Sequence, residues 1–347
     1  MALCTGQMSL FMCKSKNREK ADRKAFLMRN GKVFLERLIS SCNGNYNPIR
    51  SFSAKELERA TNNYHNRNII TESSIFRLCR GVLPDRTISV MKFIDGSVFD
   101  AYDCCFNNIV FASQMSHNNV LKLIGCCLEV ELPVLVFESA EYGNLHDLLK
   151  RSYQSHSEPL LLKHRLKIAM EIANVFAYLH IGFSRPIVFR DLKSSYILVR
   201  EQYVPKLFNF SLSASIPEGE TYIDDGVKGT SGIAAPEYVC TGYLNEKCDV
   251  YSFGLLLLQL LSTGEDLFNM GRRLNGDKSF EMDFVKKYIE NHGFNGIVDP
   301  RIIGDELLEQ KLQSSFELAF KCQSTSAEDR PTMIDVAKQI KKMYKSF

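Results

Sequence analysis

The sequence has no tryptophan, little net charge and no long apolar run. Its formal net charge is +3 over 347 residues, with acidic and basic residues interspersed, so it has no basic patch of the kind that binds nucleic acid. The longest apolar run, at residues 253–261, is too short to cross a bilayer and predicts a buried helix. Apolar residues make up 45% of the chain, which favours a globular protein with a sizeable core.

Paired cysteine motifs are also lacking, although the chain contains eleven cysteines. The count is odd, Cys104 and Cys105 are adjacent, as are Cys126 and Cys127, and no C-x-x-C motif has a second pair. This pattern predicts neither a disulfide framework nor a zinc site. We expect reduced thiols packed as small hydrophobic side chains, and hence a cytoplasmic protein.

The N-terminal residues do not follow the order of a signal peptide, because the basic residues come after the apolar ones. Residue 2 is alanine, which excludes N-myristoylation. Cys4 and Cys13 lie beside a basic stretch at 14–24, and acylation there would hold the chain at the plasma membrane. The sequence leaves both a cytoplasmic and a membrane-associated form open.

Hydrophobic periodicity predicts a β-rich part followed by a helical part. Ser53 and Glu56 have the spacing of a capping box and predict the start of a short helix. Strand-like composition follows at 68–94, 122–129 and 133–139, whereas the helical period prevails from residue 144 onward. We therefore expect an α+β protein of two lobes.

An amphipathic helix is predicted before these lobes, at residues 26–39. Its apolar stripe contains Leu27, Gly31, Phe34, Leu35 and Leu38. Such a stripe either packs on the protein's own β-rich lobe or anchors a partner in helix-in-groove fashion, and the periodicity leaves both open. Gly31 would let a partner's backbone approach closely.

Four motifs resemble those of protein kinases and occur in the same order. VFRDLKSSYIL at 188–198 resembles the catalytic loop, and Asn209 follows at the position of the metal-binding triplet. GIAAPEY at 232–238 resembles the end of an activation segment, CDVYSFG at 248–254 a buried central helix, and EDRPTM at 328–333 its arginine motif. With a strand lysine upstream at Lys92, this order identifies the chain as a member of the protein kinase family.

The stretches at 52–64, 117–129 and 245–264 most resemble plant receptor-like cytoplasmic kinases. The resemblance implies a bilobal protein-kinase fold, with an N-terminal extension at 1–49, an N-lobe at about 50–138 and a C-lobe at about 139–347. It also implies that the residues of the structural framework are retained, namely Phe210, Glu237, Asp249 and Arg330.

The residues that serve phosphoryl transfer in that family are mostly replaced. Alignment back from Gly81 puts Thr71, Ser73 and Phe76 at the three positions of the glycine-rich loop, so that side chains would fill the space for the phosphates. Lys92 matches the strand lysine, but its usual helix glutamate is the neutral Asn108. We expect Lys92 to be solvated or re-paired.

The catalytic loop keeps Arg190, Asp191 and Lys193, but other positions differ from the family pattern. The replacements are Phe189 for the histidine, Tyr196 for the magnesium-binding asparagine, Asn209 for the principal metal ligand and Ser211 for the triplet glycine. Mg²⁺ prefers carboxylate and phosphate oxygens, so both metal contacts are weakened. We therefore predict a pseudokinase with Lys92, Asp191 and Lys193 as relics, with no metal site and with weak or absent ATP binding.

One group of these kinases resembles the chain most: small pseudokinases that are adaptors of a coiled-coil NLR immune receptor in plants. The resemblance implies docking on the receptor's leucine-rich repeats through the 26–39 stripe, and sensing of a pathogen effector directly or through an effector-modified kinase. In the activation segment we assign Tyr222, Gly229 and Thr230 to the partner surface, and we expect this segment to become ordered on binding. The alternatives are a pseudokinase that regulates an active kinase without an NLR, and a residually active Ser/Thr kinase.

Overall fold

The computed structural model describes residues 4–42, 44, 46–94, 101–140, 143–153, 158–262, 282–294, 297–304 and 306–347. The chain divides into two units. Residues 1–115 and 122–140 form the first unit, and residues 116–121 and 141–347 form the second.

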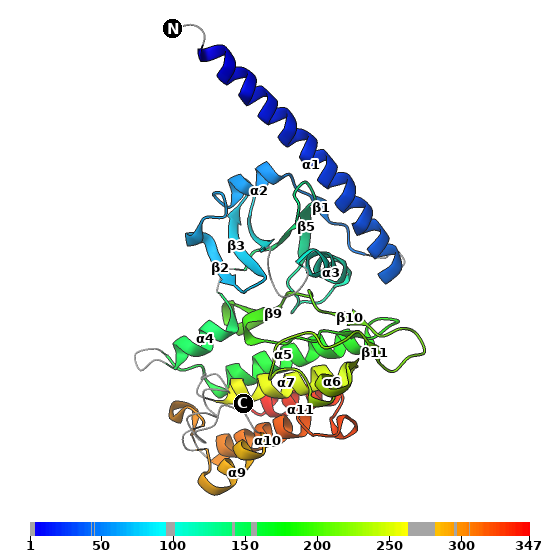
Figure 1. The fold of residues 1–347 in the computed structure, drawn as a ribbon. Helices are drawn as coiled ribbons and strands as arrows, with labels where there is room; N and C mark the ends of the chain where they lie inside the picture. Colours follow the sequence, from blue (N-terminus) through cyan, green and yellow to red (C-terminus); the bar gives the residue numbers. More distant parts are fainter. Residues whose placement is uncertain are drawn as a thin grey trace. The chain divides into compact units, whose positions relative to one another are not determined.

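A six-stranded sheet forms the centre of the first unit (Figure 1). Its strands lie in the order β1-β5-β6-β4-β3-β2, and only β1 and β5 are parallel. They are β1 (Arg50–Ser51), β2 (Ile69–Glu72), β3 (Phe76–Val82), β4 (Thr87–Phe93), β5 (Leu123–Cys127) and β6 (Val134–Glu138). The strands predicted from composition are confirmed.

Helices cover both faces of this sheet. On one face α2 (Ala54–Ala60) packs Ala54 and Leu57 against Val90 and Val136. On the other face lies α3 (Ala101–Gln114), which contacts β5. The side chain of Ser53 accepts a hydrogen bond from the Glu56 amide at the start of α2, so the predicted helix cap is confirmed.

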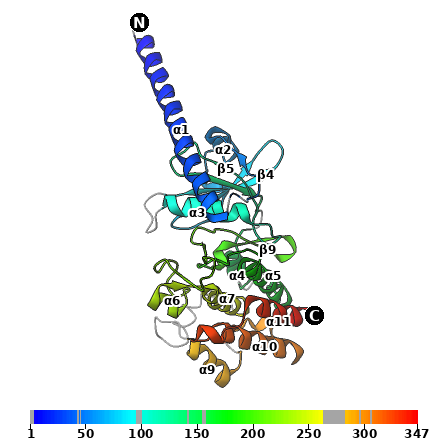
Figure 2. The same ribbon diagram turned by 90° about the vertical axis from the view of Figure 1, so that its right-hand side faces the viewer.

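Helix α1 (Cys4–Cys42) is much longer than the predicted 26–39 segment. Its C-terminal part lies beside α3 in both views (Figures 1 and 2). Arg37 forms an ion pair with Asp103 of α3. Asn30 donates hydrogen bonds to the carbonyls of Leu128 and Val130 in the β5–β6 turn, at 3.1 and 2.8 Å. This part of α1 therefore belongs to the first unit.

Helices dominate the second unit. They are α4 (Leu145–Ser152), α5 (Leu162–Ile181), α6 (Pro236–Thr241), α7 (Glu246–Leu261), α9 (Met282–His292), α10 (Glu306–Cys322) and α11 (Met333–Lys345). Short antiparallel pairs join β7 (Ile187–Val188) to β10 (Ala214–Ser215), β8 (Ile197–Arg200) to β9 (Val204–Leu207), and β11 (Ile223–Asp224) to β12 (Tyr243–Leu244). Short 3-10 helices span Asn66–Asn68 in the first unit and Ser194–Tyr196, Glu201–Tyr203, Pro300–Ile302 and Ala327–Asp329 in the second.

The predicted buried helix is α7, which contacts both α5 and α10. The β-rich first unit and the helical second unit confirm the predicted α+β fold of two lobes. Within the described ranges, no helix combines the length and the apolar character that crossing a membrane requires.

Candidate functional site

The strand position that faces helix α3 is Met91, not Lys92. Met91 is fully buried, and the Asn108 side-chain amide donates to its sulfur at 3.4 Å. Asn108 is also fully buried, so the helix position predicted for it is correct. Where a kinase has a lysine–glutamate ion pair, this unit therefore has a neutral thioether beside a neutral amide.

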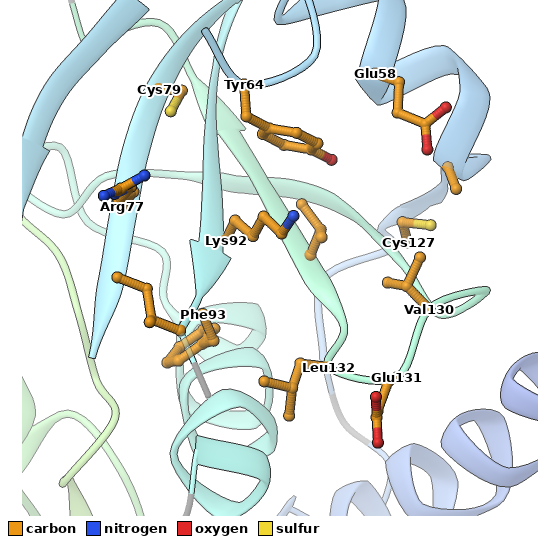
Figure 3. Close-up of a pocket in the computed structure, with 13 residues that line it drawn as sticks. Glu58, Tyr64, Arg77, Cys79, Lys92, Phe93, Cys127, Val130, Glu131 and Leu132 are labelled. Atoms are coloured by element: carbon orange, nitrogen blue, oxygen red, sulfur yellow. The ribbon is translucent and has the colours of Figure 1, made fainter. Parts of the chain in front are cut away.

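Lys92 lies on the opposite face of the sheet, which corrects its assignment as the strand lysine. It is exposed, and its Nζ lies 4.7 Å from the centre of the Tyr64 ring (Figure 3). Successive side chains of a strand point to opposite faces, so a shift of one residue in an alignment moves the lysine to the wrong side. Lys92 was expected to be solvated or re-paired, and both descriptions apply, because it is exposed and lies beside an aromatic ring.

The turn between β2 and β3 corresponds to the glycine-rich loop. Ser73 donates its amide to the Phe76 carbonyl at 2.9 Å, and its hydroxyl accepts from the amides of Ile75 and Phe76 at 3.3 Å. Phe76 is buried against Phe93. The ring thus fills the core of the first unit, and this corrects the expectation that it would occupy the space of the phosphates. Thr71 is buried as well.

The catalytic loop of the second unit is fixed by Asp249. This buried carboxylate accepts from the amides of Phe189 and Arg190, both at 2.8 Å, and lies 3.0 Å from Nε2 of His180. Phe189 packs edge-on against Phe210, with ring centres 5.4 Å apart. Asp249 and Phe210 thus have the structural positions predicted for them, whereas the partnership of His180 was not foreseen because His180 and Asp249 are far apart in sequence.

Tyr196 fills the space beside the catalytic-loop carboxylate. Only 4% of its surface is exposed. Lys193 lies with its Nζ 2.9 Å from Asp191 and 4.6 Å from the centre of the Tyr196 ring. Burial alone would lower the pKa of Lys193, but the Asp191 carboxylate and Tyr196 more than offset this and raise it. Burial raises the pKa of Tyr196, so its phenol stays protonated at neutral pH.

The triplet position, Asn209, is joined to Tyr196 and Ser211. The Ser211 hydroxyl donates to Oδ1 of Asn209 at 2.5 Å, and the Tyr196 phenol is hydrogen-bonded to the Asn209 side chain. Asn209 has a φ of +71°, which asparagine tolerates better than most residues. A neutral network thus occupies both metal-binding positions. This donor set, with Asp191 as its one carboxylate, does not fit a pair of Mg²⁺ ions.

The activation segment is anchored to its own unit, which differs from the expectation that it becomes ordered only on binding. The Thr230 amide donates to Asp191 at 3.0 Å, and Gly229 before it has a φ of +122°. Tyr222 is partly exposed, with its ring 4.4 Å from that of Tyr243. Of the three predicted partner residues, Tyr222 thus offers an exposed ring, whereas Gly229 and Thr230 hold the backbone at Asp191.

Asp225 connects the same segment to the catalytic loop. Its carboxylate pairs with the buried Arg190 and with Lys228, both at 2.8 Å. Desolvation would raise the pKa of Asp225, but the hydrogen bonds and charges of Lys228 and Arg190 lower it overall. A depressed pKa in the folded state contributes stability above the unfolded-state pKa, which is lost as the pH falls through the folded-state value.

We expect Asp225→Asn to release the activation segment because it removes the charge between two cations. Limited proteolysis at pH 7 should cleave the variant within this segment several-fold faster than the wild type. The difference in unfolding free energy should be largest at neutral pH and shrink as the pH falls through the lowered pKa of Asp225, because the carboxylate itself then becomes protonated. Asp224→Asn is the matched control, and equal behaviour of the two variants would contradict this prediction.

Glu237 and Arg330 form the predicted structural pair. The two guanidinium nitrogens of Arg330 lie 2.6 and 2.7 Å from the two carboxylate oxygens of Glu237. Arg330 also donates to the carbonyls of Ser324 and Lys247. The end of the activation segment is thereby held to the helical core.

The predicted stripe of α1 is divided between two faces. Phe34 and Leu38 are buried, whereas Leu35 is 55% exposed and Leu27 is partly exposed. A side chain added at Gly31 would meet nothing within 4 Å, so this position faces open space. The prediction that all five residues share one surface is therefore wrong, because Phe34 and Leu38 pack on the protein's own N-lobe.

A second apolar stripe on α1 was missed. Met28, Leu35 and Ile39 are all exposed, and their spacing of seven and four residues places them on one helical face. The same spacing is visible within the predicted 26–39 helix, but the stripe chosen there contained the buried Phe34 and Leu38 and left out Met28 and Ile39. The face that remains available for a partner thus consists of Met28, Gly31, Leu35 and Ile39.

Comparisons with known proteins agree with the fold and the motifs. The family model for protein tyrosine and serine/threonine kinases matches residues 90–340. The chain is 36% identical to the non-functional pseudokinase ZRK2 of Arabidopsis thaliana, over 96% of this chain and 94% of that protein. It is 37% identical to the non-functional pseudokinase ZED1 of the same plant, over 94% of this chain and 98% of the relative.

A third relative is named as a kinase rather than as a pseudokinase. The serine/threonine-protein kinase ZRK1 of Arabidopsis thaliana is 35% identical, over 94% of both chains. Relatives named as pseudokinase and as kinase thus have nearly the same similarity to this chain, so the choice between the two rests on the residues of the site. On the family match, the fold and the retained framework, the chain belongs to the protein tyrosine and serine/threonine kinase family.

Proposed function

We propose that this chain is a pseudokinase that transfers no phosphate. The observation that carries the proposal is the network of Tyr196, Asn209 and Ser211, which takes up the metal-binding positions with neutral groups. The buried pair of Met91 and Asn108 supports it independently. Phosphoryl transfer depends on metal ions and on the lysine–glutamate ion pair, and both sets of side chains are replaced here.

We further propose that the chain is an adaptor that joins a coiled-coil NLR immune receptor to an effector-modified kinase or a pathogen effector. The apolar face of Met28, Leu35 and Ile39 supports receptor docking, because α1 exposes it while its other face is packed on the N-lobe. Exposed Tyr222 on an anchored activation segment supports a second partner surface. Two relatives are named non-functional pseudokinases, and a kinase fold without activity is consistent with a binding role.

A residually active kinase is the second candidate, favoured by two observations. Asp191 and Lys193 form the ion pair that a catalytic loop needs, at 2.9 Å, and one relative is named a serine/threonine kinase. However, Thr230 donates its amide to the same Asp191 carboxylate, so this group is engaged within the protein. A base without bound metal and without an oriented phosphate provides little rate enhancement.

Phosphotransfer and nucleotide binding test the proposal together. We expect no radiolabel transfer from ATP to the protein or to a generic substrate, with either Mg²⁺ or Mn²⁺. ATP–Mg²⁺ should leave the melting temperature unchanged, whereas a ligand at a hundredfold excess over its Kd would add about 2.7 kcal/mol of stability. Incorporation that disappears in Asp191→Ala, or a magnesium-dependent rise in melting temperature, would contradict the proposal.

A further inference from the structure

A pocket of about 540 Å³ opens on the α2 face of the sheet in the first unit (Figure 3). It is formed by α2, by the turn that carries Tyr64, by strands β3 and β4 and by the β5–β6 turn. Its volume lies within the range of small-molecule sites. The pocket lies on the sheet face opposite Met91, and no residue of the kinase motifs described above lines it except Lys92.

The pocket combines apolar walls with two cations, Lys92 and Arg77, of which only Arg77 has a carboxylate partner within the described residues. Lys92 points into it, with its Nζ facing the Tyr64 ring, and within the described ranges it forms no ion pair with a carboxylate. Arg77 lies directly opposite Lys92 in the β3–β4 register, but it pairs with Glu72 at 3.1 Å. The walls are formed by Val130, Leu132 and Val134 among others. Lys92 is therefore the cation of this pocket that can pair with the anionic group of a ligand.

The backbone that presents Tyr64 is unusual. Asn62, Asn63 and Tyr64 have consecutive φ values of +50°, +55° and +53°. The left-handed region is unfavourable for tyrosine, and such strain persists only where surrounding contacts impose it. Here the Asn63 amide donates to the Glu58 carbonyl at 2.6 Å and the Tyr64 amide to the Thr61 hydroxyl at 3.0 Å. Tyr64 is thus fixed in place, with its ring beside Lys92.

The phenol of Tyr64 adds a hydrogen-bond donor. Burial raises its pKa well above the usual value, so the hydroxyl keeps its proton at neutral pH. A donor and an ammonium group next to apolar walls match a ligand that has one anionic end and an apolar body. Glu58 and Glu131 also line the pocket, and the charge of Glu58 contributes to the raised pKa of Tyr64, so a ligand with more than one anionic group would be repelled.

We propose that this pocket binds a small monocarboxylic acid with an apolar body, whose carboxylate contacts Nζ of Lys92 and the hydroxyl of Tyr64. The apolar body then lies against Val130, Leu132 and Val134. Val130 and Leu132 belong to the β5–β6 turn. In this turn the carbonyls of Val130 and Glu131 accept hydrogen bonds from Asn30 and Arg29 of α1. The ligand thus contacts the same turn that fixes α1 to the N-lobe.

Calorimetric titration of the full chain with decanoate, below its micellar concentration, tests the proposal. Decanol and decylamine are the probes of equal chain length. We expect decanoate to bind about tenfold more tightly than decanol and decylamine not to bind, because an ammonium group would face Lys92. Tighter binding of decylamine, equal binding of decanol, or no binding of decanoate at millimolar concentration would overturn it.

Substitutions in the pocket test whether the ligand binds at the proposed residues. Lys92→Met should weaken decanoate binding about tenfold and leave decanol unchanged, and Leu132→Trp should block both probes by filling the pocket. Arg80→Met is the matched control, since Arg80 is an exposed cation of β3, the strand next to that of Lys92, and does not line the pocket. Melting temperatures identify any variant that fails to fold, and Tyr64→Phe then replaces Lys92→Met as the test of the polar end. Unchanged decanoate affinity in a folded Lys92→Met or Tyr64→Phe protein would refute the assignment.

Discussion

Leu38→Glu is expected to lower the free energy of unfolding of the isolated protein by about 3–5 kcal/mol, because it places a charge in a packed site. Leu38 is 1% exposed on α1. Leu35→Glu should leave the free energy of unfolding nearly unchanged, since Leu35 is 55% exposed on the same helix. The two substitutions introduce the same charge only three residues apart, so burial is the difference between them.

Receptor binding should instead depend on the exposed Leu35, which hardly affects stability. Burying a leucine at an interface contributes about 1.5–3 kcal/mol, and a charge in its place adds a desolvation cost. Leu35→Glu should therefore weaken binding to an NLR leucine-rich repeat domain by at least about a hundredfold. Met28→Glu should do the same, because Met28 lies on the same face.

The measurement is a thermal melt of each variant together with its affinity for the receptor. Ser40→Glu is the matched control, since Ser40 is exposed on α1 but lies roughly a third of a turn from the Met28–Leu35–Ile39 face. Unchanged affinity in Leu35→Glu and Met28→Glu would refute docking through this face. Because these exposed positions should leave the folded state intact, that result would leave the pseudokinase assignment untouched.

The framework of the fold could be predicted from the sequence because its signals are local or fixed in order. The cap at Ser53, the strand composition of 87–94 and the apolar run of α7 each depend on neighbouring residues. The retained pair of Glu237 and Arg330 follows from two recognisable motifs. Such signals survive even where the chemistry of the site has changed.

The alternation of strand β4 could not be settled by the motif alone. Met91 and Lys92 are adjacent, and either can be aligned with a strand lysine. The cross-strand register decides between them, because Met91 pairs with Leu135 and points towards Asn108, whereas Lys92 pairs with Arg77 on the other face. A lysine in the expected place in the sequence is thus no evidence for a lysine in the site.

Phe76, which stands at a glycine position of the kinase motif, shows the same limit of sequence reasoning. In sequence it is a bulky residue in a glycine position, which predicts obstruction of the phosphates. In the folded unit its ring packs against Phe93, and the serine at position 73 closes the turn with its own hydrogen bonds. Which side of a turn a side chain occupies depends on packing between distant residues, and the motif contains no such information.

Glu237→Ala is expected to lower the free energy of unfolding by about 3–5 kcal/mol, because it leaves a buried charge without its partner. The guanidinium of Arg330 is fully buried and forms two short hydrogen bonds with Glu237. Glu220→Ala removes an exposed carboxylate of the same activation segment and should change the free energy by less than about 1 kcal/mol.

Urea denaturation at pH 7 measures this effect, with the m-value as a check that the transition is the same. The double variant Glu237→Ala/Arg330→Met should be more stable than Glu237→Ala, since it removes the uncompensated charge. Its stability stays below that of the wild type because the carbonyls of Ser324 and Lys247 lose their donor. If Glu237→Ala lowers the free energy of unfolding no more than Glu220→Ala does, the Glu237–Arg330 pair does not stabilise the fold, and the prediction is wrong.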